Sequence, residues 1–171
     1  MPQAKPVKLR AMLKGGHHGG VAALSCALLL SCADKSDITL TANLSEPRAT
    51  VAPGVFGFSF TGDCTLVLQV GGYASDASTV TVETFSLNSE NQESLVAPLD
   101  WKPVGATLPF VVAKGSTSKL MLQLGPTQLT ESLANRICTE SIVYVAAVSD
   151  SLAQGRVSEV RGQAFMAGCA K

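Results

Sequence analysis

Histidine is confined to the start of this 171-residue chain, at His17 and His18. The residues that follow have no imidazole for Ser-His-Asp or Cys-His catalysis, for a histidine-ligated zinc site, or for acid–base chemistry near neutral pH. A hydrolase built on two carboxylates needs no histidine. The acidic residues are scattered, however, without a marked pair and without the dense spacing of a calcium loop. We therefore expect no enzyme, metal or cofactor, and leave only the carboxylate hydrolase open.

No apolar run near the start is long enough for a permanent membrane span. Val21–Leu30 has ten residues, whereas a transmembrane helix needs about 20. The segment before it contains no acidic residue, and its charged residues are Lys5, Lys8, Arg10 and Lys14. A basic segment followed by a short apolar core is typical of an export signal. We expect this segment to be removed.

The apolar run ends in Leu29-Leu30-Ser31-Cys32. This sequence resembles the lipobox of bacterial lipoproteins, with a leucine three positions before a cysteine and a small residue directly before it. The resemblance implies cleavage before Cys32 and acyl chains on Cys32, so that lipid holds the protein on a membrane. Ala33 instead of aspartate resembles the pattern sent on to the outer membrane. The resemblance covers residues 1 to about 33 only.

Two other processing sites are alternatives to cleavage before Cys32. Cys26 would leave almost no apolar core ahead of the cleavage site, so it is interpreted as part of that core. Cleavage after Ala33 would match a small-x-small site and release a soluble periplasmic or secreted protein. The predicted organisation is a signal peptide over 1–31, a lipidated cysteine and tether over 32–37, and a single domain over 38–171.

The chain from Cys32 onward has little charge and no basic excess. It has 140 residues, with 9 basic and 13 acidic side chains. A mildly acidic domain lacks the basic face that nucleic-acid binding requires, so no nucleic-acid partner is expected. The length suits one domain with its own core.

Apolar and polar residues alternate over many short segments, among them Ile38–Leu44 and Ser78–Leu87. This period of two predicts half-buried strands. No alternation of strands and helices is visible, which disfavours a parallel sheet. We predict a mainly β protein, an antiparallel β-sandwich of about seven to eight strands with one short helix. The helix is placed at Pro126–Ile137, where Leu129, Leu133 and Ile137 are four residues apart. A turn is placed at Thr61–Asp63, and a hairpin at Thr107–Val112 with Lys119–Leu124.

Three cysteines follow Cys32, namely Cys64, Cys138 and Cys169. They form no C-x-x-C motif, so a structural disulfide is expected rather than a redox site. If Ile142–Val148 and Arg156–Phe165 pair as a hairpin, Cys138 and Cys169 fall nearly opposite each other. This pairing is favoured, and Cys64 with Cys138 is the next alternative.

Aromatic residues are few, at 5% of the chain. Trp101, the single tryptophan, lies between Pro98 and Pro103 and is a candidate ligand contact that would stack on a sugar or anchor a protein. The alternative is that it folds back onto the core. Tyr73, after two glycines, is a second candidate. The alternating Phe56, Phe58 and Phe60 are predicted to form one wall of the core.

These features together predict an outer-membrane lipoprotein whose non-catalytic β-sandwich is a binding or assembly subunit of the cell envelope. Its expected partners are the membrane, through the lipid on Cys32, and an envelope protein bound at an exposed strand edge. The alternatives are a glycan-binding module that uses Trp101 and a soluble exported protein.

Overall fold

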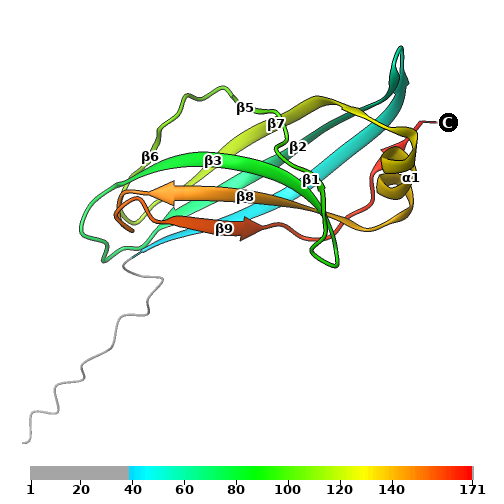
Figure 1. Ribbon diagram of the computed structural model, residues 1–171. Helices are drawn as coiled ribbons and strands as arrows, with labels where there is room; N and C mark the ends of the chain where they lie inside the picture. The colour runs from blue at the N-terminus through cyan, green and yellow to red at the C-terminus, as the bar shows by residue number, and fades with distance from the viewer. Residues whose placement is uncertain (1–38, 171) are drawn as a thin grey trace, which may run out of the picture. The chain divides into compact units, whose positions relative to one another are not determined.

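Two facing β-sheets make up the part of the protein that the structure describes, residues 39–170 of a computed structural model (Figure 1). The first sheet contains, in spatial order, β10 (Gly168–Cys169), β1 (Leu40–Gly54), β2 (Gly57–Val70), β7 (Thr117–Leu129) and β5 (Trp101–Val104). The second contains β4 (Ser94–Val96), β3 (Ser78–Ser89), β8 (Ile142–Asp150) and β9 (Val157–Arg161), and β6 (Phe110–Val112) also pairs with β3. Among these strands, only β1 and β10 pair in parallel. The structure confirms the mainly β, sandwich-like fold.

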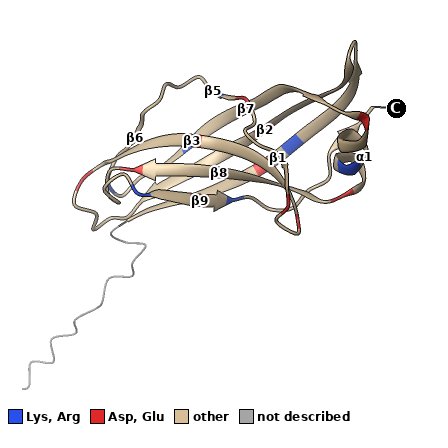
Figure 2. Ribbon diagram, viewed as in Figure 1, with Lys and Arg blue, Asp and Glu red and all other residues tan. Residues whose placement is uncertain are grey.

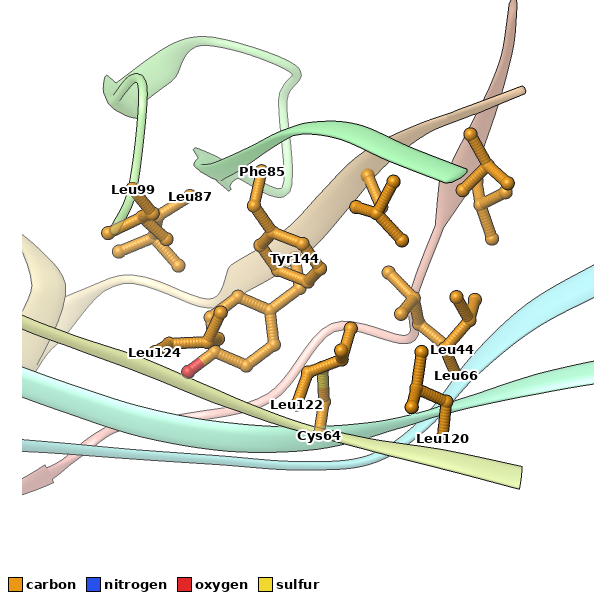
Figure 3. Packing of buried hydrophobic residues seen from close by; sticks show 14 of the residues in the cluster. Leu44, Cys64, Leu66, Phe85, Leu87, Leu99, Leu120, Leu122, Leu124 and Tyr144 are labelled. Atoms are coloured by element: carbon orange, nitrogen blue, oxygen red, sulfur yellow. The ribbon is translucent and has the colours of Figure 1, made fainter. Parts of the chain in front are cut away.

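Alternation along the strands places one set of side chains between the sheets. In β2, Cys64, Leu66 and Leu68 are buried while Gln69 is exposed. The facing strand β8 is buried along most of its length because both its neighbours and the first sheet cover it. Figure 3 shows the resulting core, with leucines from β2 and β7 packed against Phe85 and Tyr144 of the second sheet.

Tyr144 connects the two sheets through a hydrogen bond across the core. Its hydroxyl donates to the backbone carbonyl of Arg48 at 2.7 Å, from β8 to β1. Gly62 makes room for this contact, because a Cβ there would overlap the hydroxyl and lie 2.7 Å from the Arg48 carbonyl oxygen. Burial raises the pKa of the Tyr144 hydroxyl well above its ordinary value, so it stays a neutral donor.

The helix α1 (Glu131–Thr139) closes one end of the sandwich. Thr130 caps it by accepting a hydrogen bond from the amide of Leu133, as helix N-caps commonly do. Its buried residues, Ala134 and Ile137, face the core. Leu133 and Ile137 are four apart, the spacing that predicted the helix. The predicted start at Pro126 is wrong, because Pro126–Leu129 still belongs to β7.

A disulfide joins this helix to the last strand. Cys138 and Cys169 are bonded, with their Cα atoms 6.0 Å apart. β8 and β9 form the predicted hairpin, and Phe165 bridges to Ile142 beyond it, which brings the two cysteines together. The favoured pairing is therefore confirmed, and Cys64 is a free, buried thiol.

Three local expectations are wrong. Thr61–Asp63 is not a turn but lies within β2, where the pairing with β7 shifts register between Phe60 and Gly62. The segments β6 and β7 do not form a hairpin, because β6 pairs with β3 in one sheet and β7 with β2 in the other. Phe56 is 89% exposed instead of lining the core with Phe60.

Candidate functional site

The structure describes the predicted ligand contacts, but not the predicted anchor. Cys32, the signal segment and the tether fall outside the described residues. Trp101 begins β5, is half-buried and packs against the core cluster. Tyr73 lies in the loop after β2 and is 75% exposed. The two aromatic residues therefore do not form one flat surface, and each has a different surrounding.

The described part of the chain has neither a metal-binding cluster nor a reactive cysteine. Within residues 39–170, no cluster of three or more histidine, cysteine or acidic side chains has the proximity that a metal ion requires. Nor does any helix in this range have the length and apolarity needed to cross a membrane. Burial raises the pKa of the Cys64 thiol to about 12, so it lacks the thiolate character of a reactive cysteine.

The solvent face of the first sheet is hollowed across its strands. The hollow has a volume of about 480 Å³, which lies within the usual range of small-ligand sites. β1, β2, β5 and β7 all contribute to it, through Arg48, Thr50, Thr61, Asp63, Val104, Met121 and Gln123, together with the backbone near Ala49, Gly62 and Leu122. We call this the sheet-face groove.

Two irregularities in strand pairing meet at this groove. Between β1 and β2 the register shifts between Ser45 and Arg48, and between β2 and β7 it shifts between Phe60 and Gly62. Bulges increase the twist and bend the strand locally. The two shifts lie on either side of Gly62 and Asp63 in β2, and we infer that the bends they introduce hollow the sheet there.

One rung of the sheet brings four polar side chains into a row. Arg48 pairs with Asp63, Asp63 with Gln123, and Gln123 with Lys102. Neighbouring strands are about 4.8 Å apart, so the row is about 14 Å long. Within residues 39–170, none of these four side chains makes a hydrogen bond or an ion pair with another side chain or with the backbone, so their donors and acceptors are available to a ligand.

The outer edge of β1 is a second exposed feature. On one side, β1 pairs with β2 along its length. On the other side, only Thr50 and Val51 pair with a strand, β10. β9 lies near β1 without pairing with it, and Gly162 lies against Leu44, so Leu40–Asn43 is a part of this edge that has no paired strand. Beside it lies a hollow of about 300 Å³, which the start of β1 and the β8–β9 connection line.

Natural sheet edges are normally protected by charge, proline or a bulge. β5 has Lys102 and Pro103, and β9 has Glu159 and Arg161. The segment Leu40–Ser45 has none of these, since Pro47 and the bulge come after it. Among the described strands, the edge of β1 at this segment is therefore poorly protected, and its backbone groups can pair with a partner strand.

Comparison with known proteins adds no relative: no family model matches the chain, and no curated protein matches it. The arguments for function therefore come from the groove and the edge. Sequence patterns did not identify Arg48, Asp63, Gln123 and Lys102, because strand pairing between distant segments brings them together. The alternation in Ile38–Leu44 did predict a strand, but its position at an edge had no sequence signal.

Proposed function

We propose that this protein is a lipid-anchored, non-catalytic binding subunit of the bacterial cell envelope, which recruits an extended segment of another envelope protein along the edge of β1. The unprotected edge at Leu40–Asn43 is the observation that supports this most directly. Acyl chains on Cys32 would hold the domain at the outer membrane.

An added strand would gain both backbone and side-chain contacts at this edge. Backbone groups that β1 does not use with β2 would supply the hydrogen bonds of strand addition, and alternate side chains would supply specificity. The hollow beside Leu40 offers one apolar contact, from Leu152, and two charged contacts, from Asp150 and Arg156. A partner segment with alternating apolar and polar residues would fit both features.

Site-specific photo-cross-linking in intact cells tests this proposal. A photoreactive residue at Asn43, exposed on β1, should capture one envelope protein. The same residue at Thr84, exposed on β3, should not capture it. The variant Asn43→Lys should reduce capture from a probe at Thr41, because charge on an edge opposes strand addition, whereas Thr84→Lys should not. Equal capture from both strands would refute strand addition.

A glycan ligand is the second candidate, and the unpaired row in the sheet-face groove favours it. Asp63 and Gln123 can accept hydrogen bonds from sugar hydroxyls, while Arg48 and Lys102 can donate. Exposed Met121 offers an apolar contact beside them. This site replaces Trp101 as the main expected glycan contact, because Trp101 packs against the core.

Titration with cell-wall and capsular oligosaccharides separates the two candidates. A glycan site predicts binding that Asp63→Asn or Gln123→Ala weakens by at least about tenfold, the loss of one good polar contact. Thr84→Ala, on the other sheet, should bind as the parent does. Binding that both groove variants leave unchanged would exclude the groove.

A further inference from the structure

The tip of the β1–β2 hairpin has an unusual composition for a turn. Gly54 pairs with Gly57, so Val55 and Phe56 are the two turn residues, and they are 91% and 89% exposed. Glycine, asparagine, aspartate and serine normally occupy such positions. In Figure 1 this hairpin extends beyond the neighbouring strands of the sandwich.

Backbone geometry does not explain the two apolar residues. The positive φ of this turn falls on Gly57, at +122°, where glycine is required. Val55 and Phe56 are not among the residues with positive φ, so polar residues would fit the turn equally well. Since they are almost fully exposed, they add little to the core. Apolar residues at turn positions that normally hold polar residues or glycine, with no benefit to folding, indicate a functional contact.

The end of the hairpin is also free of charge. Arg48 and Asp63, paired on one rung, are the last charged residues on either strand before the tip, and the fourteen residues Ala49–Gly62 contain none. Six further rungs lead to Gly54 and Gly57, a length of about 20 Å. Figure 2 accordingly shows no charged residue along this end of the hairpin.

We propose that Val55 and Phe56 insert into the surface of a lipid bilayer. Charged groups are costly in a bilayer, and unpaired backbone groups are costly too. The hairpin end has no charge, and the pairing of β1 with β2 continues up to Gly54 and Gly57, so the backbone groups between the two strands are paired. A protein interface, by contrast, needs about 800 Å² on each partner and has a polar rim. Two side chains on an uncharged tip provide neither that area nor a polar rim.

Two apolar side chains give weak, reversible membrane attachment, so a second attachment is needed for stable contact. The lipid proposed on Cys32 would supply this second attachment. The inference therefore rests on the lipid anchor of the proposed function, but not on strand addition at β1. The tip lies at the opposite end of β1 from Leu40. Attachment at both ends would therefore lay β1 along the membrane surface.

Fluorescence in vesicles tests the insertion. The full chain, purified from the envelope in detergent, is reconstituted into vesicles of phosphatidylethanolamine and phosphatidylglycerol that contain brominated lipid. In the variant Phe56→Trp, the fluorescence of the new tryptophan should shift to shorter wavelength in vesicles, relative to an exposed tryptophan in water, and should be quenched by the bromine. The matched control Val111→Trp, at a site 60% exposed on β6, should show neither effect, and the parent chain gives the baseline from Trp101.

Each other outcome overturns the inference. Emission from Phe56→Trp that is unquenched, or quenched no more than that from Val111→Trp, means that the tip does not enter lipid. A shift seen in native envelopes but not in lipid vesicles assigns the tip to a protein pocket instead. The intact mass of the same purified chain reports acylation of Cys32 separately, so failure of the anchor and failure of the tip are distinguishable.

Discussion

Replacing Gly62 with alanine should destabilise the domain far more than one added methyl group usually does. The new Cβ would occupy the position of the Tyr144 hydroxyl and lie 2.7 Å from the Arg48 carbonyl oxygen. Overpacking of a core costs about 1–3 kcal/mol. Displacing the hydroxyl also breaks its part-buried hydrogen bond to the Arg48 carbonyl, which costs about 1–2 kcal/mol more. We expect a total loss of about 3 kcal/mol in the free energy of unfolding.

A double-mutant cycle isolates the cause. Tyr144→Phe alone should cost about 1–2 kcal/mol, because it leaves the Arg48 carbonyl without its donor. In the combined variant the methyl no longer meets a hydroxyl, and the nearest ring atom, Cζ, would be 3.3 Å away. The double variant should therefore lose less than the sum of the two single variants, with a coupling of at least about 1 kcal/mol.

Urea unfolding, followed by Trp101 fluorescence and circular dichroism, measures these free energies. Gly72→Ala is the matched control, because a Cβ there would meet no atom within 4 Å, and it should change stability by less than about 0.5 kcal/mol. If Gly62→Ala is as mild as this control, or if the two single variants add within about 0.5 kcal/mol, the assigned contact between Gly62 and Tyr144 is wrong.

Three further predictions concern the cysteines and the helix. Replacing Cys138 and Cys169 with serine should lower the free energy of unfolding by about 3.7 kcal/mol on the loop-entropy model, given their separation of 31 residues; no change in the urea midpoint would contradict this. Arg136 hydrogen-bonds Glu93 and lowers the pKa of its carboxyl, so this contribution to stability is present above the ordinary pKa and is lost as pH falls through the lowered value. Below about pH 4.5 the urea midpoint should fall less steeply in Arg136→Gln than in the parent, and parallel curves would refute the link. Cys64, whose burial raises its pKa to about 12, should resist thiol reagents at about pH 8 until urea unfolds the chain, and reaction in native buffer would show that the thiol is accessible.

Much of the fold could be predicted from the local pattern of apolar and polar residues. Alternation in Ile38–Leu44 and Ser78–Leu87 predicted strands, and the structure has β1 from Leu40 and β3 from Ser78. The pairing of Cys138 with Cys169 followed from a single hairpin, since both cysteines lie close to its strands in sequence.

The errors arose where distant segments decide the outcome. Thr61–Asp63 has turn residues, yet pairing with β7 continues the strand through a bulge, and Gly62 serves the Tyr144 contact. Lys119–Leu124 has its partners in β2 and β5 and not in the segment just before it. The groove row depends on the same register and could not be predicted without it.

The pairing of β2 with β7 also has a consequence for how the chain acquires its structure over time. Residues 58–69 of β2 meet residues 117–129 of β7, and the four strands β3 to β6 separate β2 from β7 in sequence. Sheets with such distant pairings fold in milliseconds to seconds, because a long loop must close before any contact stabilises it. During that interval the apolar faces of β1 and β2 lack their cover, so a newly made chain should depend on chaperones that bind extended apolar segments.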